Sequence, residues 1–176
     1  MEAAAKLFFS SPRFAVAGAS TDTSKFGYKS KLITTYLKTI FTVNTVFTCI
    51  VLAWYHQHSL PVTPLNPKSA EIALPSHKYP TVASPSALSS PSQTSLSIVT
   101  PPKITLAVLK EAKSVDIPAV WLQPGTYDDE VLAYARDNFK AAVGGEGGNG
   151  SEGWCVLVDG EDALAAAGVD WTAQKL

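Results

Sequence analysis

Strand-length apolar runs alternate with helical segments along most of the chain, and this alternation limits the fold more than any other feature. Strands that alternate with helices predict a parallel sheet covered on both faces. Right-handed crossovers then give the doubly wound arrangement. We therefore predict one Rossmann-like α/β domain over residues 1–176, with about five mainly parallel strands and helices on both faces. The strand candidates are Phe14–Ala19, Leu60–Pro67, Leu96–Thr100, Ile117–Gln123 and Trp154–Val158.

Helices are expected between the later strands. Residues 103–114 place Ile104, Val108 and Ala112 on one face. A second helix is expected to begin at Thr126, which with Asp129 forms a variant of the capping box, and to carry an apolar stripe of Leu132, Ala135 and Phe139. Residues 161–167 predict a short closing helix that ends at Gly168. The stretch 79–95 is rich in Ser and Pro and is predicted to be an irregular connection, either without regular structure or with one turn of helix.

The composition excludes several classes of partner. The 14 basic and 15 acidic residues give a net charge of −1, so we expect no broad electrostatic surface for nucleic acid or an anionic membrane. An anionic ligand must then be held locally, by a few amides and one or two lysines. The two cysteines, Cys49 and Cys155, make neither a disulfide framework nor a zinc site and fit a reducing compartment. With no secretory signal at the N-terminus, the cytoplasm is the predicted location.

Two segments fall outside the α/β pattern. Residues 144–153 hold six of the 11 glycines and predict a flexible surface loop; a phosphate cradle is the alternative, but the Gly-Lys-Ser/Thr ending is missing. Residues 30–50 form an apolar run near membrane-spanning length, yet Lys38, Asn44 and many threonines argue against a span. The same run is rich in β-branched residues and predicts a poor helix where the fold needs one.

Several short motifs, in order and spacing, resemble the small stand-alone CoA-binding proteins, which are related to the CoA-binding domain of succinyl-CoA synthetase α subunits. These motifs are Phe14–Ser20, Lys25-Phe-Gly-Tyr-Lys29, Pro64-Leu-Asn-Pro-Lys68, Tyr79-Pro-Thr-Val82, Val99-Thr-Pro-Pro102, Trp121-Leu-Gln-Pro-Gly125 and Cys155. Residues 30–50 interrupt the resemblance, because in such proteins the first loop runs directly into a helix. The codons available to Ser30-Lys31 and Ile50-Val51 can contain splice-site sequences. We hypothesise that this segment is a retained intron translated into protein.

The strand exit Gly18-Ala19-Ser20 is the first candidate for ligand binding. Backbone amides at such a turn present partial positive charge to a phosphate, and Ser20 adds a hydroxyl donor. The alternative is a tight exit in which Ser20 only caps a helix. Lys25 follows in the loop, either meeting phosphate or remaining solvated.

The end of the second strand discriminates between nucleotides. NAD-binding proteins commonly place an acid there, whereas this chain has Asn66, Pro67 and Lys68. A lysine suits the ribose phosphate of CoA or of NADP. The residues leave these two open, and the resemblance favours CoA or an acyl-CoA.

The third and fourth strands end at the same predicted edge. Thr100, Pro101 and Pro102 form either a rigid wall for the ligand or a plain strand terminator before a helix. Gln123 and Gly125 follow the fourth strand, and Gln123 either donates to a ligand or bonds within its loop. No metal site is predicted, since His56 and His58 lack a third ligand nearby and suit a helix end with partly exposed histidines. Cys155 is expected inside a strand as a small buried hydrophobe.

The predicted function is a module that binds a small nucleotide ligand, CoA or acyl-CoA, without catalytic residues of its own. The related synthetases need further domains for which this length leaves no room, and no Ser/His/Asp or paired-carboxylate arrangement replaces them. There are two alternatives: an NADP-dependent oxidoreductase, and a regulatory or interaction protein that keeps the fold without a ligand. Whether the chain forms a homodimer stays open.

Overall fold

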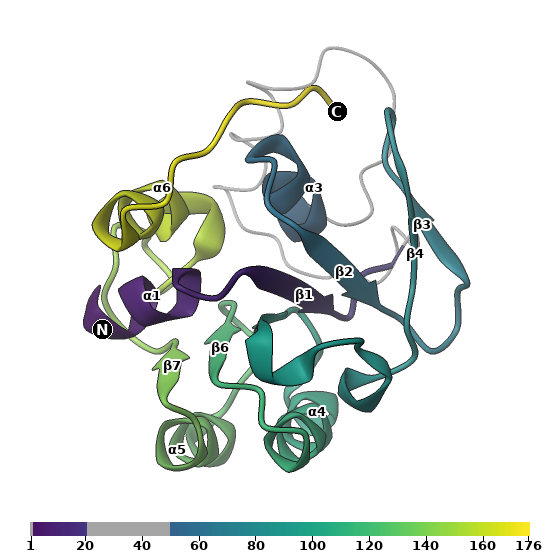
Figure 1. Ribbon diagram of the computed structural model, residues 1–176. Coiled ribbons are helices and arrows are strands. Elements are labelled where there is room, and N and C mark those ends of the chain that lie inside the picture. The colour runs from purple at the N-terminus through teal and green to yellow at the C-terminus, as the bar shows by residue number, and fades with distance from the viewer. Residues whose placement is uncertain (1, 21–49) are drawn as a thin grey trace.

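The computed structural model describes residues 2–20 and 50–176. Its central feature is a five-stranded, wholly parallel sheet of order β2-β1-β5-β6-β7 (Figure 1). The order reverses between β1 and β5, as the doubly wound prediction requires. The sheet strands are β1 (Arg13–Ala17), β2 (Val62–Leu65), β5 (Thr94–Ile98), β6 (Ala119–Leu122) and β7 (Ala141–Val143).

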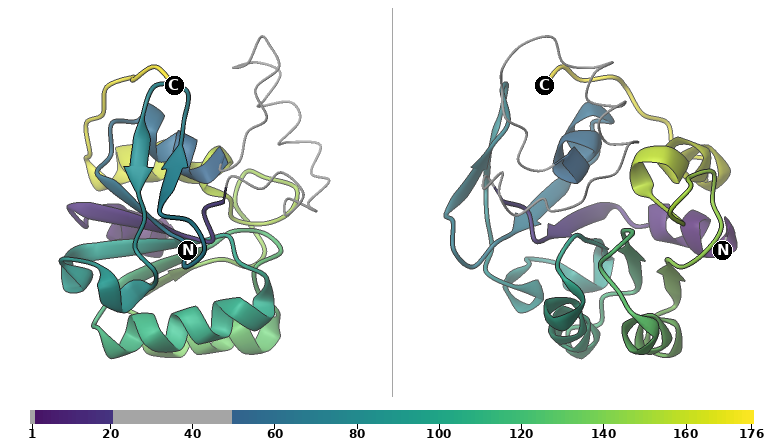
Figure 2. Two further views of the ribbon diagram at one scale, coloured as in Figure 1. Left: turned by 90° about the vertical axis from the view of Figure 1, so that its right-hand side faces the viewer. Right: turned by 180° about the vertical axis from the view of Figure 1, so that it is seen from behind.

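Helices cover both faces of the sheet. One face carries α1, α3 and α6, and the other carries α4 and α5 (Figures 1 and 2). Alternate strand residues serve the two layers, because successive side chains of a strand point to opposite faces: Phe14 and Val16 pack on the α3 side, and Ala15 and Ala17 on the α4 side. The helices are α1 (Glu2–Phe9), α3 (Ile50–Gln57), α4 (Pro102–Ser114), α5 (Asp129–Asn138) and α6 (Val156–Ala167).

The fifth strand is not where the sequence analysis placed it. The run 154–158 was predicted as a strand, but α6 begins at Val156, and the last sheet strand is β7. In α6 the buried residues Val156, Gly160 and Ala163 recur at helical spacing, so the apolar run is the first turn of an amphipathic helix. Gly168 ends this helix with a φ of 68°, which confirms the predicted stop.

Several smaller predictions for the helices were also wrong. In α4 the buried residues are Thr105, Leu109 and Ala112, while Ile104 is 52% exposed. The cap of α5 is Asp128 rather than Thr126: the Asp128 carboxylate accepts from the Val131 amide at 3.0 Å.

The connection between β2 and β5 contains more regular structure than predicted. A two-stranded antiparallel hairpin lies beside the main sheet (Figure 1) and is followed by two short 3-10 turns. Its strands are only three residues long, too short for an alternating pattern to be recognised. The elements are β3 (Glu71–Ala73), β4 (Lys78–Pro80), η2 (Pro85–Ala87) and η3 (Pro91–Gln93).

The histidine pair at the end of α3 is buried, against the prediction of partial exposure. His56 and His58 are 2% and 3% exposed. His56 hydrogen-bonds with the Tyr79 hydroxyl and the Lys175 carbonyl, and His58 stacks on Trp54. Within residues 2–20 and 50–176 no cluster of His, Cys, Asp or Glu could hold a metal ion. In the same residues, no helix is long and apolar enough to span a membrane.

Candidate functional site

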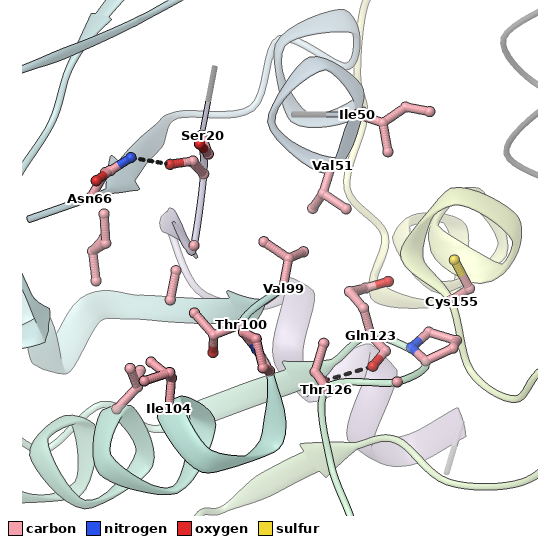
Figure 3. Close-up of a pocket in the computed structure, with 18 of the residues that line it drawn as sticks. Ser20, Ile50, Val51, Asn66, Val99, Thr100, Ile104, Gln123, Thr126 and Cys155 are labelled. Atoms are coloured by element: carbon pink, nitrogen blue, oxygen red, sulfur yellow. Dashed lines mark hydrogen bonds between the residues drawn. The ribbon is translucent and has the colours of Figure 1, made fainter. Parts of the chain in front are cut away.

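A cavity of about 790 Å³ lies at the carboxyl ends of β1, β2, β5 and β6 (Figure 3). This position follows from the topology. The strand order reverses between β1 and β5, so the loops after these two strands run to opposite sides of the sheet and leave a crevice between them. Helices α3, α4 and α6 supply the remaining walls. The sheet edge therefore brings together loops that are far apart in the sequence.

Gly18 allows the ends of β1 and β5 to approach each other closely. Its φ is +93°, and a Cβ atom built on it would lie 2.8 Å from Cγ2 of Thr100. Its amide donates to the Leu65 carbonyl at 3.2 Å. Glycine is thus required here for both conformation and space, and its amide serves the sheet rather than a ligand.

Asn66 joins the exits of β1 and β2. Its Nδ2 donates to the Ala19 carbonyl at 2.7 Å, and its Oδ1 accepts from the Lys68 amide at 2.8 Å. Both polar atoms of Asn66 are therefore engaged within the protein. The residue shapes the edge of the cavity next to Ser20 (Figure 3).

Charged groups are sparse around the cavity. Lys68 is exposed, and it is the single cationic side chain among the described residues that line the cavity. Glu111 lies on the α4 wall, where burial alone would raise the pKa of its carboxyl, but hydrogen bonds from Ser84 and the Ser86 amide outweigh burial and lower it. An anionic ligand therefore has one cation available within this part of the chain.

Thr100 and Pro101 line the cavity where β5 passes into α4. Thr100 exchanges a hydrogen bond with the Thr105 hydroxyl at 2.9 Å, and Pro101 is the N-cap residue of α4. Pro102 is the first residue of the helix and does not line the cavity. The two prolines thus start the helix, and Pro101 also forms part of the wall.

Gln123 and Gly125 close the site at the end of β6. Gln123 is 5% exposed, and its Oε1 accepts from the Val156 amide at 3.0 Å. Gly125, with a φ of +83°, turns the chain toward α5. Figure 3 shows Gln123 between Thr126 and Cys155.

Most of the predicted site residues converge on this one cavity. Two predicted residues are exceptions. Lys25 lies outside the described residues, and Pro102 is the first residue of α4 and does not line the cavity. The predicted residues that line the cavity are Gly18, Ala19, Ser20, Asn66, Pro67, Lys68, Thr100, Pro101, Gln123 and Gly125.

The apolar wall of the cavity was missed by the sequence analysis. It is built by side chains from α3, α4, α6 and the residue that follows β5, which sequence patterns assign to a hydrophobic core or to helix faces. Its main members are Ile50, Val51, Val99, Ile104, Leu157 and Val158. The sequence carried no signal for Ile104 and Val108, because their spacing places them on the apolar face of the helix, whereas the residues that are buried are Thr105, Leu109 and Ala112.

Cys155 faces this cavity instead of lying within a strand. It is the N-cap residue of α6 and is partly buried. Burial, together with the charges of Asp159 and Glu152, raises the pKa of the Cys155 thiol to about 11. The thiol is therefore protonated at neutral pH and is a poor nucleophile.

The glycine-rich loop is held against α6 by a buried carboxylate. Asp159, 2% exposed, accepts from the amides of Asn149 at 2.6 Å and Cys155 at 2.8 Å. Gly150 and Gly153 line the cavity. The carboxylate already occupies these amides, which argues against a phosphate cradle in this loop.

A family model described as CoA binding domain matches residues 44–147, more than half of the chain. The chain belongs to the CoA binding domain family. The matched region of this CoA binding domain contains every predicted site residue from Asn66 onward, whereas β1 and the Gly18 turn precede it. Membership supports CoA as the ligand, as the sequence resemblance implied.

Solved structures show the same fold for this CoA binding domain. A hypothetical protein from Pyrococcus horikoshii OT3 matches with a TM-score of 0.57 and 19% identity, over 93% of this chain and 91% of the other. Prb, described as a protein redesigned for binding, matches with a TM-score of 0.56 and 16% identity over the same shares. Among curated proteins no match was found.

Proposed function

We propose that this protein binds CoA or an acyl-CoA in the cavity at the carboxyl edge of its sheet. The observation that carries the proposal is the family match, which spans three of the four strand ends that form the cavity. A volume of about 790 Å³ lies within the range of small-molecule and cofactor sites. The mixture of a few polar groups with an apolar wall suits a ligand that has a charged nucleotide and a less polar arm.

In this proposal the nucleotide lies toward the Gly18–Ser20 turn and Lys68. The phosphates would lie against the Gly18–Ser20 turn, and Lys68 would meet the ribose phosphate. The pantetheine arm would then run past Thr100 and Pro101 toward Gln123 and the apolar wall. The cationic and apolar parts of the lining support this direction.

We further propose a binding role without catalysis, in the cytoplasm. Among the described residues that line the cavity, Ser84 donates a hydrogen bond to Glu111, but the lowered pKa of this carboxyl makes it a weak base, no histidine is present, and the Cys155 thiol is protonated at neutral pH. A carrier or sensor of CoA needs only affinity. Turnover of an acyl-CoA thioester by the purified protein would contradict this part of the proposal.

Thermal unfolding with four nucleotides separates the proposal from its alternatives. A ligand that binds the native state raises the melting temperature by mass action. We expect CoA and acetyl-CoA at millimolar concentration to stabilise the protein, and NAD to leave it unchanged. Stabilisation by NADP alone would favour an oxidoreductase, and no shift with any ligand would favour a protein that keeps the fold without a ligand.

A further inference from the structure

The side-chain amide of Gln123 is held in one orientation by the N-terminus of α6. Its Oε1 accepts from the Val156 amide at 3.0 Å, which fixes the opposite side of the group as the donor. The backbone is fixed as well, because the Gln123 carbonyl accepts from both the amide and the hydroxyl of Thr126. The direction of the Nε2 donor is therefore set by the fold.

This donor has no partner within the described part of the protein. Gln123 Nε2 is buried and makes no hydrogen bond there. A buried amide without a partner costs free energy, and such groups in native proteins call for an explanation. Since Gln123 lines the cavity, a ligand can supply the acceptor.

The charges near Gln123 define what kind of acceptor fits. Asp159 is buried at the start of α6, and Glu152 also lines this end of the cavity. The charges of both carboxylates raise the pKa of the neighbouring Cys155 thiol, whereas the backbone amides of Leu157 and Val158 lower it. Figure 3 shows Asn66 across the cavity from Cys155, and Lys68 follows Asn66 at the end of β2. A phosphate or carboxylate is thus disfavoured beside Gln123, and a neutral oxygen is favoured.

We infer that Gln123 Nε2 donates to a neutral carbonyl oxygen on the arm of the ligand. The inference rests on the proposed function. In CoA such an oxygen belongs to the amides of the pantetheine arm, and an acyl-CoA adds the thioester carbonyl. Gln123 then determines specificity for the arm, while the β1 and β2 exits hold the nucleotide.

Calorimetric titration of two Gln123 variants tests this assignment. Gln123→Met removes both the donor and the acceptor, whereas Gln123→Glu keeps an acceptor for the Val156 amide and removes the amide donor. The melting temperature of each ligand-free variant reports the loss of the Val156 hydrogen bond separately. The ligands are CoA, acetyl-CoA and adenosine 3′,5′-bisphosphate, which lacks the arm.

We expect both variants to bind CoA about tenfold more weakly than wild type, the usual effect of leaving one buried polar partner unsatisfied. Their affinity for the bisphosphate should stay within about twofold. A loss with acetyl-CoA but not with CoA would assign the acceptor to the thioester. Unchanged affinity for both CoA and acetyl-CoA, or equal losses with CoA and the bisphosphate, would overturn the inference while wild-type CoA binding stands. Wild type that binds no CoA would remove the proposed function and the inference together.

Discussion

At the scale of single residues, the backbone conformation of Gly18 determines how closely the ends of β1 and β5 approach each other at the cavity. Gly18→Ala would place a methyl group 2.8 Å from Thr100 Cγ2 at a φ of +93°. We expect the free energy of unfolding to fall by about 2 kcal/mol or more, and CoA binding to weaken because the two strand exits separate.

Gly168→Ala is the matched control for this substitution. Gly168 also has a left-handed φ, of 68°, but an added Cβ would meet nothing within 4 Å. Urea denaturation of this variant should show a loss of only about 1 kcal/mol, with CoA affinity unchanged. Equal losses of unfolding free energy in the two variants would mean that the close approach of Gly18 to Thr100 does not add to the cost of the Gly18→Ala substitution.

Lys68 should report which phosphate the β2 exit holds. The side chain is exposed at the cavity, so solvent screens its charge and the effect of its removal is modest. We expect Lys68→Ala to weaken CoA by about threefold to tenfold and to leave dephospho-CoA nearly unaffected. Titration calorimetry with both ligands measures this difference. Equal losses would show that Lys68 does not meet the 3′-phosphate.

Cys155 should react slowly because its thiol stays protonated. The pKa of about 11 lies above that of an ordinary cysteine, so the thiolate is scarce at neutral pH and becomes abundant only as the pH approaches 11. At pH 8 we expect alkylation by iodoacetamide to be roughly a hundredfold slower than for a free cysteine. Peptide mapping separates Cys155 from Cys49. A rate that levels off near pH 8.5 would contradict the raised pKa, and CoA should slow the reaction further.

At the scale of elements, the glycine-rich loop and α6 depend on one buried carboxylate. Asp159→Ala would leave the amides of Asn149 and Cys155 without their acceptor. We expect a loss of about 2–4 kcal/mol in urea denaturation. Asp162→Ala is the control, because Asp162 also contacts Asn149 but is exposed, and it should cost less than about 0.5 kcal/mol. Similar losses for the two variants would mean that burial of Asp159 is unimportant.

The same elements show what sequence patterns could and could not reveal. The parallel sheet and the Gly168 stop were predictable because alternation and capping are local signals. The last strand was missed because Ala141–Val143 is short and poor in β-branched residues, while 156–158 has the composition of a strand but a helical burial pattern. The polar residues of the site were found at strand ends, where topology places ligands. Its apolar wall depends on how α3, α4 and α6 pack, which no local pattern states.

At the scale of the whole molecule, the described residues complete the doubly wound fold without residues 21–49. The first crossover runs from β1 to β2 through α3, which begins at Ile50. Ile50 and Ser20, the described residues on either side of 21–49, both line the cavity. Nine residues, 21–29, can extend about 30 Å, and they remain to make this connection when the segment that follows them is removed.

A variant that lacks residues 30–49 and keeps α3 whole tests the hypothesis that this segment does not belong to the functional protein. We expect it to unfold cooperatively at the same or a higher temperature, because a shorter loop costs less entropy to close. Its affinity for CoA should stay within about threefold of wild type.

A second variant that lacks only 30–43 spares the residues covered by the family match, which begins at residue 44. If only the shorter deletion folds and binds, residues 44–49 are part of the domain; if neither does, the whole segment is, and the intron hypothesis falls. Transcript sequencing decides its origin independently, since a dominant mature message containing the segment would show that it is exon.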